Sequence, residues 1–231
     1  MRQQRSTTLF CFSPPVMLLT FVIELALALY TVVRYKMTEL SRLAVAILLL
    51  LAFFQISEYM LCGGLGLRGV DWVRFGYISI TLLPPVGLHM AMVLAKKNIV
   101  WLRTAAYVSA AVFIYFFVFV TQSLNGNDCR PNYQVFHLHR NLTDWYGLYY
   151  YGWLIVSTYL MLRWAQTSKR RRQLMALAAG YAVFIVPTTL VNILNPATTD
   201  GIPSIMCGFA VLLAIILAVG VLPGAGALRR R

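Results

Sequence analysis

Residues 43–54 of this chain read LAVAILLLLAFF, an unbroken apolar run that continues with few polar residues to position 63. Seven such stretches occupy most of the 231 residues, and each is long enough to cross a hydrocarbon core of roughly 30 Å as a helix. In lipid every backbone amide needs an internal partner, and continuous apolar runs suit helices better than the alternating strands of a barrel. The sequence therefore predicts an all-α fold, a polytopic seven-helix membrane bundle formed by a single domain, 1–231. The expected spans are 14–34, 43–63, 73–95, 100–121, 145–166, 173–194 and 203–222.

The basic residues between these spans lie mainly on alternate connections. If the N-terminus faces outward, 14 of the 20 lysines and arginines lie on the cytoplasmic side and 6 lie outside. Cytoplasmic loops of membrane proteins carry this excess, so we expect a protein of the cell membrane with its N-terminus outside and its C-terminus in the cytoplasm. The net charge of +13 is then an interfacial property. The runs Lys169–Arg172 and Arg229–Arg231 would attract anionic lipid headgroups rather than nucleic acid.

The first span has one alternative interpretation. Arg2 and Arg5 precede an apolar run, and Ala26-Leu27-Ala28 has the small-x-small form of a signal-peptide cleavage site. Cleavage would leave six spans and reverse the match between charge and topology, and Glu24 would lie inside the apolar core of the signal. We therefore expect an uncleaved first span.

The four cysteines become informative once this topology is drawn, because all of them lie on or near the outer face, where disulfides persist. Cys62 ends the second span and Cys129 lies in the long connection before the fifth. A Cys62–Cys129 disulfide is predicted to hold that connection over the bundle. Cys11 and Cys207 either form a second pair or serve as small packed side chains. No CxxC spacing or His/Cys cluster predicts a metal site, and no motif predicts a cofactor.

Polar residues inside the predicted spans are the first candidates for function, because ionised groups are costly in lipid. Glu24 lies near the middle of the first span, Gln55 and Glu58 share one face of the second, and His89 lies in the inner half of the third. Counting from the outer boundary places Glu58 and Arg74 at similar depths, which predicts an ion pair between them. Each also has a structural interpretation: Glu24 as a packing residue, His89 bonded to a carbonyl or hydroxyl of another helix, and the ion pair as helix-to-helix glue.

Aromatic residues and prolines gather in the same outer half. Tyr149, Tyr150 and Tyr151 are consecutive, so at least one must point into the bundle, and Pro84, Pro85 and Pro187 bend helices and free carbonyls. These features predict an outward-facing ligand pocket beneath the connection that carries Cys129. Its residues are Glu58, Arg74, Tyr77, Tyr150, Trp153 and Asn192. An interfacial aromatic belt with ordinary packing would explain the same residues.

The third span carries a resemblance to a known family. Trp72-Val73-Arg74-Phe75-Gly76-Tyr77, followed by Leu83-Pro84-Pro85-Val86-Gly87-Leu88-His89, resembles the corresponding helix of the N-terminal seven-helix sensor regions of some bacterial histidine kinases. The resemblance implies helices that receive an outside or membrane signal and pass it to a cytoplasmic output domain. No phosphoacceptor helix, ATP-binding module or cyclase follows Arg231 in this sequence. It therefore implies a stand-alone sensor that signals through a separate cytoplasmic or membrane protein partner.

Other functions lack the residues that they need. Residues 203–222 contain no lysine for a retinal Schiff base, and a single intramembrane histidine without an intramembrane aspartate argues against a zinc hydrolase. Ser79 and Ser109 have no evident base, so we do not expect an enzyme. A sensor or receptor that binds a small molecule or lipid is favoured. A transporter or channel that uses Glu24, Glu58 and His89 is the alternative, and a membrane assembly partner is a second alternative.

Overall fold

The computed structural model describes residues 14–63, 69–120, 124–129, 134–138, 140–195 and 202–224. This part of the chain is helical apart from one small two-stranded sheet, which confirms the predicted helical fold. The helices are α1 (Pro14–Arg34), α2 (Glu39–Gly63), α3 (Gly69–Ala95), α4 (Val100–Phe119), α5 (Arg140–Ala165), α6 (Arg171–Leu194) and α7 (Ile202–Ile215). A π-helical segment, η2 (Ile216–Val221), and a short α8 (Leu222–Gly224) continue α7 without a break.

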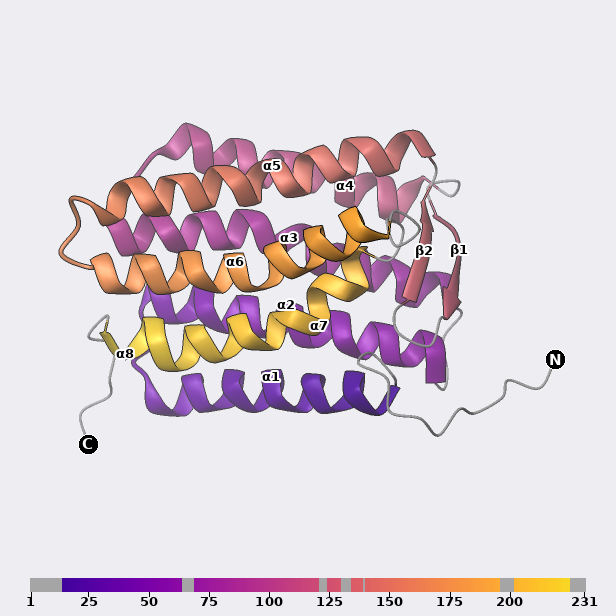
Figure 1. The fold of residues 1–231 in the computed structure, drawn as a ribbon, viewed down its shortest axis with the longest axis horizontal. Coiled ribbons are helices and arrows are strands. Elements are labelled where there is room, and N and C mark those ends of the chain that lie inside the picture. Colours follow the sequence, from indigo (N-terminus) through magenta and orange to yellow (C-terminus); the bar gives the residue numbers. More distant parts are fainter. Residues whose placement is uncertain are drawn as a thin grey trace.

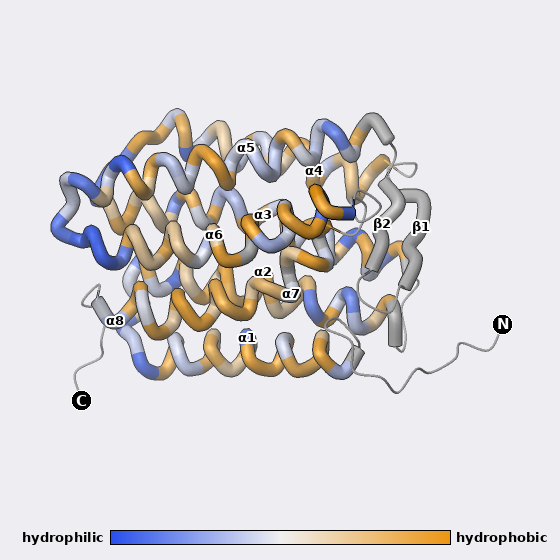
Figure 2. Tube along the Cα trace, in the orientation of Figure 1, coloured by the Kyte–Doolittle hydropathy of each residue, from blue (hydrophilic) through white to orange (hydrophobic). Residues whose placement is uncertain are grey.

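The long helices run side by side and alternate in direction (Figure 1). The sheet lies at one end of the bundle, which we call the hairpin end. The α5–α6 connection lies at the opposite end, which we call the basic end because Lys169, Arg170, Arg171 and Arg172 lie there. Figure 2 shows this concentration of hydrophilic residues, whereas apolar residues dominate the helices between the two ends.

Six of the helical segments are long and apolar enough to cross a membrane: α1, α2, α3, α4, α6 and the continuous α7–η2–α8. Helix α5 is as long as the others, but its sequence is less apolar than theirs and does not qualify as a candidate membrane span. Its first turns contain Arg140, Asn141 and Asp144, and tyrosines replace aliphatic residues further along. The structure is therefore compatible with a multi-pass membrane protein that has six apolar helices and a more polar α5 packed among them.

Helix α1 has its polarity reversed relative to a helix of a water-soluble protein. Thr20, Glu24 and Thr31 are buried against the bundle, whereas Leu19 and Val33 are exposed. Positions four and seven apart share one face of a helix, so the polar side chains form an inward stripe. An apolar outer face and a polar inner face suit a helix that is surrounded by lipid.

Helices α2 and α3 form the interior of the bundle. In the most apolar window of α3, 72% of the residues are buried, against 22% in α4. Helix α3 packs against α2, α4, α5 and α6, while α1 packs against α2 and α7. This arrangement places the polar residues of α2 and α3 where several helices can reach them.

One of the two prolines of α3 frees a backbone carbonyl that another helix satisfies. Pro85 has no N–H to donate to the carbonyl of Thr81, four residues earlier. The Tyr149 hydroxyl of α5 donates to this carbonyl at 2.6 Å, and the Tyr146 hydroxyl lies 3.0 Å from Thr81 Oγ1. Tyr149 and Tyr150 are both buried, which confirms that the tyrosine run points at least partly into the bundle.

The π-helical segment near the end of the chain has a similar partner. Such segments interrupt the regular i→i−4 hydrogen bonding of an α-helix. The hydroxyl of Tyr35, which directly follows α1, donates to the carbonyl of Ala218 at 3.1 Å. The turn between α1 and α2 is therefore attached to the last long helix at the basic end.

The long α4–α5 connection contains strands that sequence analysis missed. Strand β1 (Leu124–Cys129) pairs antiparallel with β2 (Gln134–Leu138). Asn125-Gly126-Asn127-Asp128, whose residue types favour turns, lies inside β1, where the register shifts between Leu124 and Asn127. Glycine and asparagine suit such an irregularity because they tolerate unusual backbone angles. The sheet packs near α2 and α3 at the hairpin end.

Candidate functional site

The structure does not contain the predicted ion pair between Glu58 and Arg74. The Arg74 guanidinium instead contacts the Asp71 carboxylate at 3.5 Å, one turn earlier on α3. Asp71 lies on the same helix at i−3, so the two side chains meet without crossing to another helix. Both are partly exposed, whereas Glu58 is buried. Counting residues from the membrane boundary could not show that Asp71 lies nearer to Arg74 than Glu58 does.

The other residues of the predicted pocket have separate environments. Tyr77 is 2% exposed and belongs to an aromatic cluster, with its ring centroid 4.7 Å from that of Phe117 and 5.6 Å from that of Tyr146. Trp153 Nε1 donates to Ser109 Oγ at 3.0 Å, and Asn192 lies near the end of α6. These contacts are those of helix packing.

Tyr150 lines a cavity between α2, α3, α5, α6 and α7. Its volume is about 20 Å³, and its other walls are almost entirely aliphatic, including Leu51, Leu83 and Leu213. This volume accommodates about one water molecule, and apolar cavities of this kind stay dry. The cavity therefore offers no room for an organic ligand.

The strongest polar feature is a pair of buried acids, which we call the acid site: Glu24 of α1, Glu58 of α2 and Ser204 of α7. Glu24 is 0% exposed and Glu58 is 1% exposed. Within the described part of the chain, neither carboxyl oxygen of Glu24 has a hydrogen-bond partner, and Glu58 Oε1 has none either. The Ser204 hydroxyl hydrogen-bonds the Glu58 carboxyl. Glu58 also acts electrostatically on Glu24 from the neighbouring helix.

Local hydrogen bonding explains why nearby hydroxyls leave Glu24 unpartnered. Thr20 Oγ1 donates to the carbonyl of Met17 at 2.9 Å, and Thr31 Oγ1 donates to that of Leu27 at 2.8 Å. Both threonines therefore bond within α1. Gln55 is buried one turn before Glu58 on α2, as its spacing predicted. The inward stripe of α1 thus presents an unsatisfied carboxyl to α2 and α7.

Unpartnered acids in this position are energetically unfavourable. Burying a polar group without a hydrogen bond costs about 1–3 kcal/mol by mutational measures, and burying an isolated charge costs more. Two acids that repel each other add to that cost. A polar site of this kind within a membrane helix bundle is a first candidate for function.

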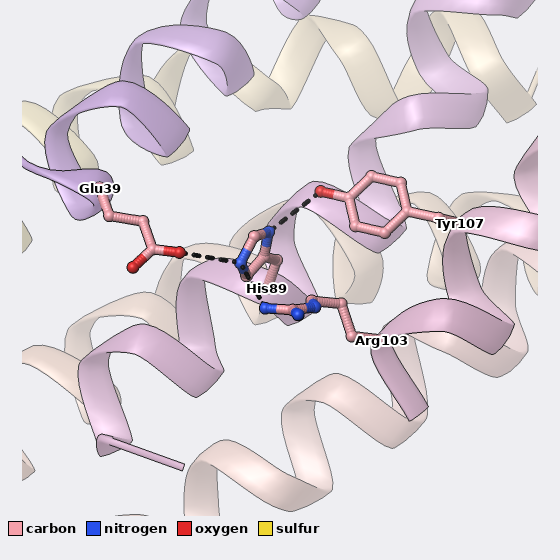
Figure 3. Close-up of polar contacts among 4 residues, drawn as sticks. All are labelled: Glu39, His89, Arg103 and Tyr107. Carbon is pink, nitrogen blue, oxygen red and sulfur yellow. Dashed lines mark hydrogen bonds and ion pairs between the residues drawn. The ribbon is translucent and has the colours of Figure 1, made fainter. Parts of the chain in front are cut away.

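A second polar cluster lies at the basic end, where α2, α3 and α4 meet (Figure 3). His89 Nδ1 lies 3.2 Å from the Tyr107 hydroxyl, which agrees with the predicted hydroxyl partner on another helix. His89 Nε2 lies 3.3 Å from Glu39 Oε1 and 3.4 Å from Arg103 Nη1. We call Glu39, His89, Arg103 and Tyr107 the histidine cluster. When Nε2 carries a proton it donates to Glu39, and when it does not it accepts from Arg103.

The remaining predicted site concerns the cysteines. The side chains of Cys11, Cys62, Cys129 and Cys207 lie outside the described part of the structure, so both disulfide hypotheses stay predictions. Among the side chains that are described, no group of three His, Cys, Asp or Glu residues is placed to hold a metal ion.

Sequence analysis identified both acids but missed Ser204, Glu39, Arg103 and Tyr107. Hydroxyls and helix-end charges are too common for spacing alone to single them out. Comparison with known protein families finds no matching family model. Comparison with curated proteins finds no similar sequence.

Proposed function

We propose that this chain is a sensor or receptor-like protein of the cell membrane that receives a signal at the acid site and passes it to a separate protein through α7. In this proposal all seven long helices cross the membrane, with the N-terminus outside and the C-terminus in the cytoplasm. The basic end is then cytoplasmic, in keeping with the excess of lysines and arginines on that side. Tags at the two termini, probed in intact and opened cells, test this orientation.

The observation that carries the proposal is that one helix joins the two ends of the bundle. Ser204 in the first turn of α7 bonds to Glu58 at the acid site. Further along the same helical segment, the carbonyl of Ala218 accepts the hydrogen bond from Tyr35. A change at the acid site that alters the Ser204 bond would therefore act on a helix whose other end lies at the basic end.

The resemblance of residues 72–77 and 83–89 to kinase sensor regions supports the same proposal. A sensor of this type needs no catalytic residues of its own, and its partner would be a cytoplasmic or membrane protein that binds at the basic end. Anionic lipids are a further expected partner of that end, since its lysines and arginines are attracted to such headgroups.

Movement of α7 tests the proposal directly. Spin labels carried by non-natural amino acids at Met37 and Val219, both exposed, report the distance between the α1–α2 turn and η2. We expect Glu58→Gln, which alters the bond to Ser204, to shift the distance distribution measured in lipid nanodiscs. Ser157→Ala is the matched control, because Ser157 is buried in α5, which packs mainly against α3 and α6. Identical distributions for the wild type and Glu58→Gln would contradict coupling through α7.

A proton or cation transporter is the second candidate, and the unpartnered oxygens of Glu24 favour it. Transporters use carboxyls of this kind as binding steps within the membrane. In proteoliposomes that contain a pH-sensitive dye, a transporter would produce a flux that Glu24→Gln abolishes. A sensor would show no flux in the same vesicles.

A further inference from the structure

We infer that the histidine cluster senses pH at the basic end, with the proton on His89 Nε2 selecting which neighbouring helix holds α3. With that proton the ring donates to Glu39 of α2, and without it the ring accepts a hydrogen bond from Arg103 of α4 (Figure 3). This role goes beyond the proposed function, because the cluster becomes a second input that shares no residue with the acid site.

The first argument is that Nε2 faces two groups with opposite requirements. Glu39 Oε1, at 3.3 Å, can only accept a hydrogen bond when the carboxyl is ionised. Arg103 Nη1, at 3.4 Å, can only donate one. A single ring nitrogen cannot satisfy both neighbours at once. Addition of a proton therefore favours the contact with α2, and its removal favours the contact with α4.

The second argument is that the other ring nitrogen keeps its partner in both states. The Tyr107 hydroxyl lies 3.2 Å from His89 Nδ1, and a hydroxyl can either donate or accept. The two rings meet edge to face, with centroids 6.0 Å apart and an interplanar angle of 88°. Tyr107 thus holds the orientation of the imidazole while the exchange takes place at Nε2.

Protons from the aqueous phase can reach the ring. The His89 side chain is 17% exposed, and that of Glu39 is 63% exposed. Histidine is the side chain whose charge ordinarily changes between about pH 5 and 8. The exposed Glu39 carboxylate can turn toward water when Nε2 loses its proton, so release of α2 leaves no buried charge without a partner.

The other titratable groups near this level do not compete for the ring. Among the described side chains, the charges that act on His89 are those of Arg103 and Glu39. Helix α6 approaches α3 here through Tyr181, which lies against Gly87, and its residues 173–180 include no titratable side chain. Further titratable residues toward this end of the elements around α3 are exposed: Arg42 of α2, Lys96 and Lys97 after α3, Tyr159 and Arg163 of α5, and Arg171 and Arg172 of α6.

The position of Glu39 connects the cluster to the last helical segment. Glu39 begins α2, four residues after Tyr35, whose hydroxyl donates to the carbonyl of Ala218. A change in how α3 holds the first turn of α2 would therefore act beside the turn that is attached to η2. The pH at the basic end would in this way bear on the contact between that turn and the last helix.

Thermal unfolding of two variants in nanodiscs of a zwitterionic lipid tests the inference. Midpoints are measured at about pH 5.5 and about pH 8, near the two ends of the ordinary histidine range. Glu39→Gln removes the charge that attracts the protonated ring, so it should lower the midpoint more at the lower pH. Arg103→Gln removes the donor to the unprotonated ring, so it should lower the midpoint more at the higher pH.

Two further variants make the comparison specific to the ring. Both pH differences should disappear in a His89→Phe background, which keeps an aromatic ring without nitrogens. Arg42→Gln, at an exposed arginine one turn after Glu39, is the matched control and should have the same effect at both pH values. The inference is overturned if Glu39→Gln and Arg103→Gln respond to pH in the same direction, or if their responses persist without His89.

Nitrogen NMR of the wild type, labelled in its histidines, keeps the inference testable even if the variants fail to fold. The chain has three histidines, and His137→Gln and His139→Gln identify the signals of the other two. His89 should carry protons on both nitrogens at the lower pH and on Nδ1 alone at the higher pH. A proton that stays on Nε2 at the higher pH would overturn the inference, as would a ring that remains in one state throughout. Coupling from the acid site through α7, measured with the spin labels at Met37 and Val219, is decided separately.

Discussion

Helix α2 carries an acid near each end, and the two acids lie in opposite surroundings. Glu39, at the basic end, is 63% exposed and faces His89 and, through its ring, Arg103. Glu58, toward the hairpin end, is 1% exposed and has one hydroxyl partner and another acid nearby. A carboxylate near water with basic neighbours costs little free energy in the folded state, whereas a buried carboxyl without such neighbours lowers stability.

Under the proposed function, this difference predicts that the exposed acid serves stability and the buried acid serves function. The histidine cluster ties α2, α3 and α4 together with complementary groups. The acid site opposes packing, because an apolar side chain at position 24 would fill the same space without an unsatisfied oxygen. Residues that lower stability are retained where activity needs them. The comparison therefore predicts that replacing the buried acid Glu24 by methionine stabilises the protein, whereas the same replacement of the exposed acid Glu39 does not.

The largest expected effect is at Glu24. Glu24→Met keeps the approximate volume and removes two unpartnered oxygens, so it should raise the free energy of unfolding by about 1–4 kcal/mol, the range seen when buried ion pairs are replaced by apolar residues. Denaturant titration in lipid nanodiscs with choline as the added cation measures the change. Glu39→Met is the matched control and should be neutral or destabilising. A loss of stability in Glu24→Met would show that this carboxyl is satisfied in the membrane.

The next effect concerns the bond between Ser204 and Glu58. Ser204→Ala removes a hydroxyl that bonds to a buried carboxyl, which should lower the free energy of unfolding by about 1–3 kcal/mol. In a Glu58→Met background the same serine substitution should cost much less, because no carboxyl remains to be satisfied. A double-mutant cycle measures this coupling. Additive effects would mean that Ser204 does not stabilise Glu58.

A smaller effect is expected where the bundle satisfies a polar group that its own sequence has freed. Tyr149→Phe removes the donor to the Thr81 carbonyl and should lower the free energy of unfolding by about 0.5–1.5 kcal/mol. Pro85→Ala restores a backbone N–H that can bond to the same carbonyl. The cost of Tyr149→Phe should therefore shrink in the Pro85→Ala background. An unchanged cost would show that the tyrosine hydroxyl has another essential role.

The sequence was sufficient to predict the helical segments and the buried acids Glu24 and Glu58. It was not sufficient to predict which residues contact these acids. Apolar runs fix which segments are helical, because lipid leaves few alternatives for the backbone. The same rule made Glu24 and Glu58 conspicuous. Their surroundings depend on helix rotation and tilt, which packing against neighbours sets. The predicted partner Arg74 bonds instead to Asp71, and Ser204 gave no signal among many serines.

The hairpin shows a different reason for failure. Asn125, Gly126, Asn127 and Asp128 favour turns, and no apolar alternation in 124–129 indicates a strand. Pairing with Gln134–Leu138 forms the strand nevertheless, since β-structure depends on partners distant in sequence. A short polar hairpin at the end of a bundle is thus a feature that local propensity cannot predict.

The smallest expected effect is at Glu39, and it tests the other half of the comparison. Glu39→Gln removes the charge that faces His89 Nε2 but keeps an acceptor, so the free energy of unfolding should fall by about 0.2–1 kcal/mol at most. Because Glu39 is exposed, added salt should reduce this difference between the variant and the wild type. Salt should leave the effect of Glu24→Met almost unchanged, since buried groups are screened much less. Unfolding measured at low and high concentrations of choline chloride distinguishes the two responses, and an equal salt dependence at both positions would contradict the separation of an exposed structural acid from a buried functional one.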